Sequence, residues 1–246
     1  MTDDAAIARA LGYPYNPPTD AFCLTDGTLT PLPYLESVQD RWPVIAAGSN
    51  QSPEQLTRKF DGQGLGPVYA VPAWLSHYDC VYSAHITAYG SIPATLWLSP
   101  GTRVRIFLLW LDEAQLTRLH ATEALGHNYD YGDLSGLTLE PAIGPAPTWA
   151  GAYLSLAGAL APDGEPFALA EIPAEGRRFP ALGQRDIQAK VRALLREGEE
   201  EPFIRENIAS SEKRAKRRAA LADHALRAGA RWINSESQSA SYPFIN

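Results

Sequence analysis

The apolar run from Val104 to Leu111 is the sequence feature that most constrains the fold. Arg105 is its only charged residue, and no polar residue alternates with the apolar ones after it. Pro100 and Gly101 precede the run, and Asp112 follows it directly. A short, continuous apolar segment bounded by turn residues is typical of a strand that is buried on both faces. We therefore expect this run to be the central strand of a sheet that is covered on both sides.

Prolines and glycines divide the chain into short segments. The 246 residues include 20 prolines and 19 glycines, which predicts many turns and favours a strand-rich fold over a helical bundle. Pro100 and Gly101 predict a turn that leads into the central strand. The other expected strands are Pro43 to Ala47, Pro67 to Leu75, His77 to Ala84, Pro93 to Leu98 and Thr148 to Leu156.

Helices are expected between and after these strands. Ser52 with Gln55, and Asp112 with Gln115, match the capping-box pattern at a helix start. The second of these helices is expected to end at Gly126. Further helical patterns cover Gln184 to Arg196 and residues 206–230. The fold class is therefore α+β.

This pattern predicts one compact core with extensions. We expect an N-terminal arm over residues 1–41 that packs on the main domain, and a core over residues 42–160. Residues 161–205 are expected to form loops and a packing helix. Residues 206–246 are expected to form a basic helical extension and a mobile tail.

Composition excludes several classes of protein. The chain has 28 acidic and 21 basic side chains, and its net charge of −7 argues against a protein that coats nucleic acid or lies on a membrane surface. No apolar run approaches the roughly 18 residues of a membrane helix. The N-terminus carries Asp3 and Asp4 where a signal peptide carries cations, and Cys23 and Cys80 are the only cysteines. We therefore expect a soluble protein of the reducing cytoplasm.

Glu123 is the first candidate for a functional residue. Helical spacing places it on the same stripe as Leu116 and Leu119, which are expected to face the core. Burial there would raise its pKa above the ordinary value of about 4.3, so that the carboxyl group could accept and return a proton near neutral pH. The alternative is that Glu123 turns out to solvent at the helix end, or pairs with an arginine or a lysine.

The loop Gly48-Ser49-Asn50 is the second candidate. Glycine lets the backbone approach a ligand closely, and successive N–H groups ahead of a helix form an anion-binding concavity. A routine turn from strand to helix would give the same pattern. The tyrosines Tyr129, Tyr131 and Tyr153 are either core aromatics or the lining of a polar pocket.

Other motifs carry weaker predictions. His77, Asp79, Cys80 and His85 lie close in sequence, but their spacing does not match known zinc sites, so no metal site is expected. The cations from Lys213 to Arg218 predict a solvated helix face, with contact to an acidic partner or to phosphates as the alternative.

Several motifs together resemble the gamma-glutamylcyclotransferase-like family in order and spacing, over about Pro43 to Leu156. They are Ala47-Gly48-Ser49-Asn50 with Ser52-Pro53-Glu54, Ala94-Thr95-Leu96, Ser99-Pro100-Gly101 with Val104, and Leu116, Leu119, Glu123 and Tyr129. The resemblance implies a small mixed β-barrel with flanking helices. It also implies a reaction in which a γ-glutamyl group cyclises to 5-oxoproline and releases its amine, without a cofactor.

The resemblance also implies roles for individual residues. Gly48, Ser49 and Asn50 would hold the γ-glutamyl substrate through their N–H groups, and Glu123 would be the general acid and base. Tyr129 and Tyr153 match positions where the family places tyrosines around the bound group. Ala47 stands where the family has a tyrosine, which leaves the choice of substrate open.

A second hypothesis is a catalytically silent member that acts as a binding or assembly module. Its homo-oligomer contact or protein partner would use the basic C-terminal helix. A third is a metal-dependent hydrolase that uses His77, Asp79 and His85.

Overall fold

The computed structural model describes residues 3–227 of the chain. The expected mobile tail falls largely on residues 228–246, which lie outside the described residues. The helices are α1 (Asp3–Leu11), α2 (Pro53–Phe60), α3 (Glu113–Thr122), α4 (Gln184–Leu195), α5 (Glu200–Ala209) and α6 (Ser211–Leu221), with 3-10 turns η1 (Ser49–Gln51) and η2 (Ala222–His224). The longer strands are β3 (Trp42–Ala46), β4 (Val68–Tyr82), β5 (Ala94–Leu111), β6 (Tyr129–Ser135) and β8 (Trp149–Ser155). The shorter ones are β1 (Phe22–Thr25), β2 (Thr28–Pro31), β7 (Leu139–Pro141), β9 (Ala159–Leu160), β10 (Ala168–Leu169), β11 (Ala174–Glu175), β12 (Ala181–Leu182) and β13 (Ala225–Leu226).

The main sheet is mixed and open. Its strands run in the order β12-β10-β4-β5-β3-β8-β6, with β1, β2, β7 and β11 paired beside this path. Only β3 with β8 and β10 with β12 pair in parallel among the described strands. The edge strands β6 and β12 do not pair with each other, so the expected closed barrel is wrong, while the α+β class is confirmed.

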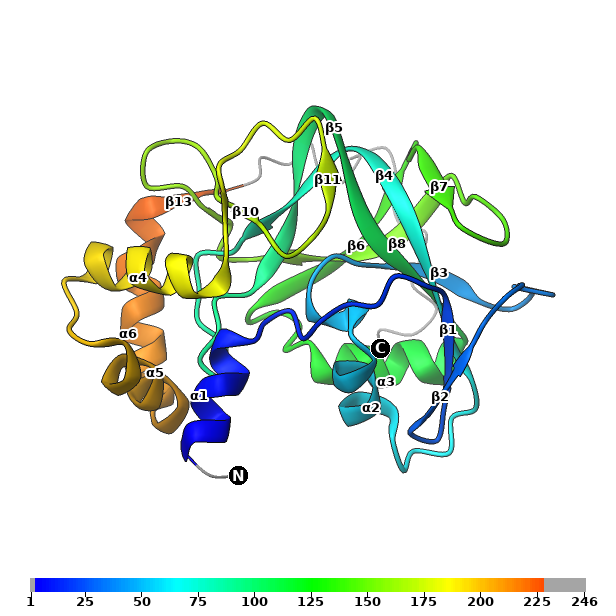
Figure 1. Cartoon of the computed structure of the whole chain (residues 1–246), viewed down its shortest axis with the longest axis horizontal. Coiled ribbons are helices and arrows are strands. Elements are labelled where there is room, and N and C mark those ends of the chain that lie inside the picture. Colours follow the sequence, from blue (N-terminus) through cyan, green and yellow to red (C-terminus); the bar gives the residue numbers. More distant parts are fainter. Residues whose placement is uncertain (1–2, 228–246) are drawn as a thin grey trace.

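The centre of the sheet is the long antiparallel pair of β4 and β5 (Figure 1). Each was expected as two strands, but each runs through without a break, and the turn predicted at Pro100-Gly101 is wrong. Ser76 pairs with Arg103 and Tyr78 pairs with Leu98, so the extra residues of β5 bulge out of the ladder between these pairs. Gly101 has a φ of 88° there, which glycine adopts without strain.

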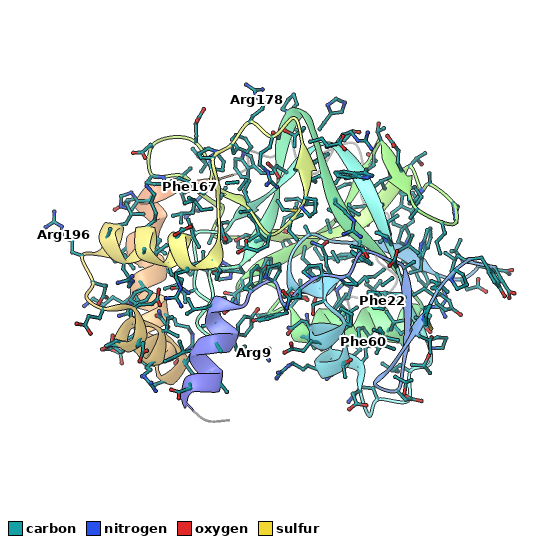
Figure 2. All side chains as sticks on the ribbon, in the orientation of Figure 1. Arg9, Phe22, Phe60, Phe167, Arg178 and Arg196 are labelled. Atoms are coloured by element: carbon teal, nitrogen blue, oxygen red, sulfur yellow. The ribbon has the colours of Figure 1, made fainter. Side chains whose placement is uncertain are left out.

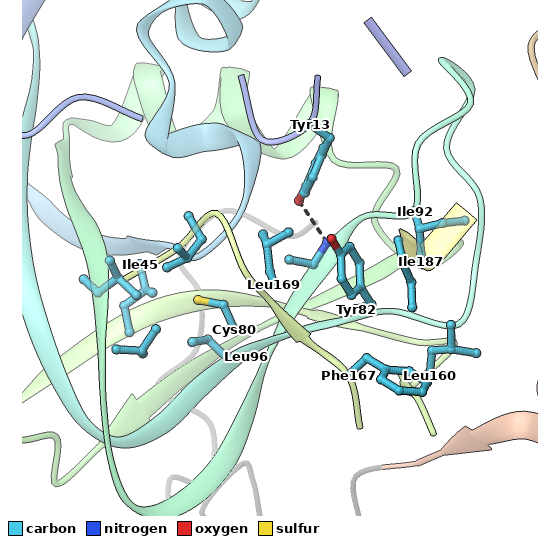
Figure 3. Packing of buried hydrophobic residues seen from close by; sticks show 14 of the residues in the cluster. Tyr13, Ile45, Cys80, Tyr82, Ile92, Leu96, Leu160, Phe167, Leu169 and Ile187 are labelled. Carbon is cyan, nitrogen blue, oxygen red and sulfur yellow. Dashed lines mark hydrogen bonds between the residues drawn. The ribbon is translucent and has the colours of Figure 1, made fainter. Parts of the chain in front are cut away.

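The expectation of a central strand buried on both faces is confirmed for β5. Val104, Ile106 and Leu108 belong to one hydrophobic cluster, while Phe107 and Leu109 belong to the other. The second cluster lies under α2 and α3 and includes Phe22 of β1 and Phe60 of α2, which Figure 2 labels close together. The first cluster, shown in part in Figure 3, extends towards α4 and α5.

The helix starts differ from expectation in one place. At α3 the full capping box forms, because Asp112 accepts from the backbone of Gln115 and Gln115 accepts from the backbone of Asp112. At α2 the box is absent: the hydroxyl of Ser52 makes no capping bond. The side chain of Gln55 instead accepts a hydrogen bond of 3.0 Å from Arg9. The helix α4 agrees with its prediction, and Arg196 follows it as the C-cap.

The C-terminal region is joined to the same core as the sheet. The helix expected over residues 206–230 is broken: α5 begins earlier, at Glu200, and α6 ends at Leu221, with Ser210 between them capping α6. Residues 228–230 lie outside the described residues. Phe203, Ile204 and Leu221 belong to the first cluster together with Ile7 of α1. Figure 1 shows α4, α5 and α6 grouped at one end of the sheet, with α1 beside α5.

The basic motif of α6 is only partly a solvated face. Arg217 is buried and forms ion pairs with Glu197 at 2.9 Å and with Glu206 at 2.7 Å. Lys213 also pairs with Glu206. Within the part of the chain that the structure describes, no helix has the length and apolar character needed to cross a membrane.

The residues weighed as metal ligands do not converge. Asp79 is fully buried and forms hydrogen-bonded ion pairs with Arg177, whose Nε lies 2.9 Å from Oδ2. The imidazole of His85 lies 2.7 Å from the hydroxyl of Ser83. Across residues 3–227, no cluster of at least three His, Cys, Asp or Glu side chains could hold a metal ion. The ion pair of Asp79 instead joins β4 to the segment that follows β11.

We predict that Asp79→Asn lowers the free energy of unfolding by about 3 kcal/mol, because it leaves the guanidinium of Arg177 without its buried counter-charge. The matched control is Glu140→Gln, which breaks the exposed pair with Arg103. That change should cost less than about 1 kcal/mol. Urea denaturation of both variants measures the difference, and equal losses would contradict the assignment.

Candidate functional site

The loop after β3 forms one wall of the candidate site. Strand β3 pairs with β5 on one side and with β8 on the other, so its end is held on both edges. The chain then passes through Ala47 and Gly48 into η1, where the N–H of Gln51 donates to the carbonyl of Gly48 at 3.1 Å. This arrangement places the loop of residues 47–50 at a fixed position beside the ends of β5 and β8.

Glu123 enters the same site from the end of α3. The helix ends at Thr122, and Glu123 is its C-cap with a side chain that is 11 % exposed. Its Oε1 accepts a hydrogen bond of 2.7 Å from Nδ2 of Asn50 and also pairs with Nζ of Lys59. The expected burial of Glu123 is therefore confirmed, and so is the alternative that it pairs with a lysine.

A small pocket lies between these two elements. Its volume is about 40 Å³, which is room for a few water molecules. The site residues that the family resemblance singled out line it, together with residues of β3, β5, β8 and the arm, whereas Tyr131 does not. The lining consists of Tyr13, Ile45, Ala46, Ala47, Gly48, Ser49, Asn50, Ala94, Thr95, Leu96, Glu123, Tyr129, Ala152 and Tyr153.

Asn50 leaves one hydrogen-bonding atom unused in this pocket. Its Nδ2 donates to Glu123, but its Oδ1 is buried and has no hydrogen-bond partner among the described residues. A buried amide oxygen without a partner is costly, so such atoms usually accept from water or from a ligand. The carboxylate of Glu123 and the side-chain oxygen Oδ1 of Asn50 are therefore two hydrogen-bond acceptors close to each other.

The opposite wall is aromatic. Tyr153 of β8 lies across from Tyr131 of β6, and the hydroxyl of Tyr153 is 2.8 Å from Nδ1 of His120. Burial raises the pKa of Tyr153 and lowers that of His120, although Glu123 acts on His120 in the opposite direction. Tyr129 stacks edge-on against His85 with ring centroids 5.5 Å apart. Both pocket tyrosines are thus neutral hydroxyl groups that can donate or accept hydrogen bonds.

Sequence reasoning missed three residues of the site. Lys59 had a detectable signal, because Leu56, Lys59 and Phe60 lie on one buried stripe of α2. A cation on an apolar stripe needs a buried anion as its partner. His120 and Tyr13 had no such signal, because His120 contacts Tyr153, and Tyr13 lines the pocket, only through the tertiary fold.

Comparisons with known proteins give structural similarity at low sequence identity. No protein-family model matches the sequence, and no curated protein does. The chain is similar to the structure of a human protein, uncharacterized protein loc79017, with 15 % identity, a TM-score of 0.36, and coverage of 74 % of this chain and 88 % of that one. It is also similar to a gamma-glutamyl cyclotransferase, with 16 % identity, a TM-score of 0.37, and coverage of 80 % and 95 %. Similarity at this level assigns no activity to the chain.

We predict that the buried pair of Lys59 and Glu123 is strongly coupled in stability. Lys59→Met should lower the free energy of unfolding by about 3 kcal/mol, because it leaves a buried carboxylate without its counter-ion. The double variant Lys59→Met, Glu123→Gln should lose clearly less than the sum of the two single losses. Urea denaturation of the four proteins tests this, and additive losses would mean that the two charges do not interact.

We also predict that buried His85 makes the protein less stable in acid. Burial lowers its pKa to about 3, against about 6.5 in an unfolded chain. Between these values only the unfolded state binds the proton, so stability falls as the pH drops below about 6.5. His85→Asn should reduce this slope by up to about 1.4 kcal/mol per pH unit. Denaturation curves at pH 7, 6 and 5 give the slopes, and equal slopes for wild type and His85→Asn would contradict the prediction.

Proposed function

We propose that this protein is a cyclotransferase that converts a γ-glutamyl amide or γ-glutamyl amino acid to 5-oxoproline and a free amine. The observation that carries the proposal is the hydrogen bond between Glu123 and Asn50 inside the pocket. It brings a buried carboxylate next to a backbone loop suited to bind a carbonyl oxygen. The motifs that resemble the gamma-glutamylcyclotransferase-like family are the same residues.

The proposed reaction is an intramolecular aminolysis. The α-nitrogen of the γ-glutamyl group attacks its own γ-carbonyl carbon and forms the bond that closes the five-membered lactam. The bond from that carbon to the leaving nitrogen then breaks. Glu123 accepts the proton from the attacking nitrogen and returns it to the leaving nitrogen, so the carboxylate is regenerated. Atoms and charges balance without an oxidant or a cofactor.

The pocket offers hydrogen-bonding groups for the γ-carbonyl oxygen and for the attacking amine of the substrate. The N–H groups of Gly48, Ser49 and Asn50 would stabilise the negative charge that develops on the γ-carbonyl oxygen. The free Oδ1 of Asn50 would accept a second N–H from the attacking amine. Tyr129 and Tyr153, as neutral hydroxyl groups, would contact the α-carboxylate or the backbone of the substrate.

Substrate entry requires the pocket to open. A volume of about 40 Å³ is far smaller than a γ-glutamyl group needs. Nδ2 of Asn50 now occupies the hydrogen-bonding site on Glu123 that the substrate amine would take. We propose that the amine replaces this amide, so that the side chain of Asn50 turns as the substrate binds.

Incubation of the purified protein with a panel of γ-glutamyl amino acids, γ-glutamyl amines and glutathione tests the proposal. Appearance of 5-oxoproline with an equal amount of free amine supports it, and free glutamate would instead indicate hydrolysis. If no member of the panel yields 5-oxoproline, the chain is better described as a catalytically silent binding or assembly module. Pull-down and light scattering with and without residues 206–246 would then test that alternative.

We predict that Glu123→Gln lowers turnover at least about 100-fold, because the amide cannot accept the proton. The protein should stay folded, since the amide fills the same space and its oxygen can still accept from Lys59. The matched control is Glu54→Gln, an exposed glutamate of α2, which should keep near-normal turnover. Rate and Tm are measured together. A folded Glu123→Gln protein with near-normal turnover would refute the role of Glu123.

A further inference from the structure

Tyr13 reaches the pocket from the N-terminal arm, between α1 and β1. It is 3 % exposed and belongs to the first hydrophobic cluster, but it is among the residues that line the pocket. We propose that Tyr13 is a positioning residue, whose phenol oxygen holds the loop of residues 47–50 against the start of β5. Its effect on catalysis rests on the proposed function, but the tie itself does not.

The first part of the tie is a hydrogen bond to β5. The backbone N–H of Ala94 donates to Oη of Tyr13 at 2.9 Å, which Figure 3 draws as a dashed line. Burial raises the pKa of Tyr13, and the N–H of Ala94 acts against this rise, with a smaller contribution from the backbone of Ser49. The phenol oxygen therefore accepts a hydrogen bond from Ala94 on β5, and the backbone of Ser49 on the loop lies close to the same oxygen.

The second part of the tie is close contact with Gly48. A Cβ atom at this position would lie 2.2 Å from Oη of Tyr13 and 3.4 Å from its Cζ. The phenol oxygen of Tyr13 thus occupies the space that a side chain at position 48 would need, and it limits how closely the loop approaches the arm.

The regions outside the family resemblance keep Tyr13 in this place. The guanidinium of Arg9 lies 5.2 Å from the ring of Tyr15 and 5.1 Å from the ring of Tyr89, and it also donates to Gln55. The hydroxyl of Ser91 donates to the carbonyl of Ala10 at 2.9 Å.

The loop that carries Tyr89 and Ser91 is itself bound by α4. Nε2 of Gln188 donates to the carbonyl of Gly90, and Gln184 exchanges two hydrogen bonds with the backbone of Ile92. The arm is thus bonded to the loop of residues 89–92, and this loop is bonded to α4. Among the described residues of the arm, Tyr13 is the one that lines the pocket.

A competing interpretation is that Tyr13 blocks the pocket, because its oxygen uses the N–H of Ala94, which a substrate could use. The two interpretations predict opposite signs for Tyr13→Phe, which removes the oxygen and keeps the ring. If Tyr13 positions the loop, the variant weakens substrate binding. If it blocks the pocket, the variant speeds the reaction.

The test that does not depend on activity is hydrogen exchange of single backbone amides in the full-length protein. Tyr13→Phe should speed exchange at Ala94 at least about 10-fold, because this N–H loses its acceptor. The matched control is Tyr82→Phe, which removes a buried hydroxyl that donates to Leu182 in the same cluster but does not line the pocket. It should leave exchange at Ala94 unchanged. Unchanged exchange at Ala94 in Tyr13→Phe would overturn the proposal.

A rescue experiment provides a second structural readout. Gly48→Ala should lower Tm in the wild type, because its Cβ collides with Oη of Tyr13. The same change should lower Tm clearly less in the Tyr13→Phe protein, where that oxygen is gone. Equal losses in the two backgrounds would contradict the contact.

Kinetics then decide between positioning and blocking. On a substrate that yields 5-oxoproline, Tyr13→Phe should raise KM at least about 5-fold with a smaller change in kcat, and Tyr82→Phe should change neither. A higher kcat/KM in Tyr13→Phe would overturn positioning in favour of blocking. If the wild type makes no 5-oxoproline, the proposed function fails, while the exchange and rescue experiments still decide whether Tyr13 ties the loop to β5.

Discussion

The burial of both faces of β5 is the constraint on which the rest of the structure depends. Alternate residues of this strand enter two separate hydrophobic clusters, so each face of the sheet needs a cover. Helices α2 and α3 cover one face, and α4 and α5 with the arm cover the end of the other. Since β5 also pairs with β3 and β4, it sets where the loop after β3 emerges. The pocket lies where these elements meet.

The buried charge of Glu123 then determines which polar side chains gather at the pocket. A carboxylate that is almost fully buried needs donors, and Glu123 finds one on the loop after β3 and another on α2. These contacts join the end of α3 to two other elements, so the same interactions that stabilise Glu123 also position the loop. The unused Oδ1 of Asn50 adds a second buried acceptor to the same small pocket.

Sequence patterns predicted the elements whose signals are local. The capping box at Asp112 and the spacing of α4 depend on residues within one or two turns, and both agree with the structure. Glu123 was expected to face inward from its helix, and it lines one pocket with the loop residues and tyrosines that the family resemblance singled out. Their chemical roles remain predictions.

The errors have a common physical cause, which is competition from distant partners. Gly101 suits a turn or a bulge equally, and only the cross-strand pairing of β4 and β5 selects the bulge. Gln55 could cap its own helix, but Arg9 takes its side chain. The polar segment of β6 becomes a strand because β8 pairs with it along its whole length. Tyr13 also reaches the pocket through contacts with residues far away in the sequence, so no local sequence pattern predicts its position.

The most direct test of the central claim is a crystal structure of the Glu123→Gln protein with an intact γ-glutamyl dipeptide bound. The account predicts that the α-nitrogen of the ligand lies within hydrogen-bond distance of residue 123, about 2.6–3.2 Å. It also predicts that the γ-carbonyl oxygen accepts from the backbone of residues 48–50. A dipeptide bound in this pocket with its α-nitrogen directed away from residue 123, or bound only elsewhere on the molecule, would contradict it.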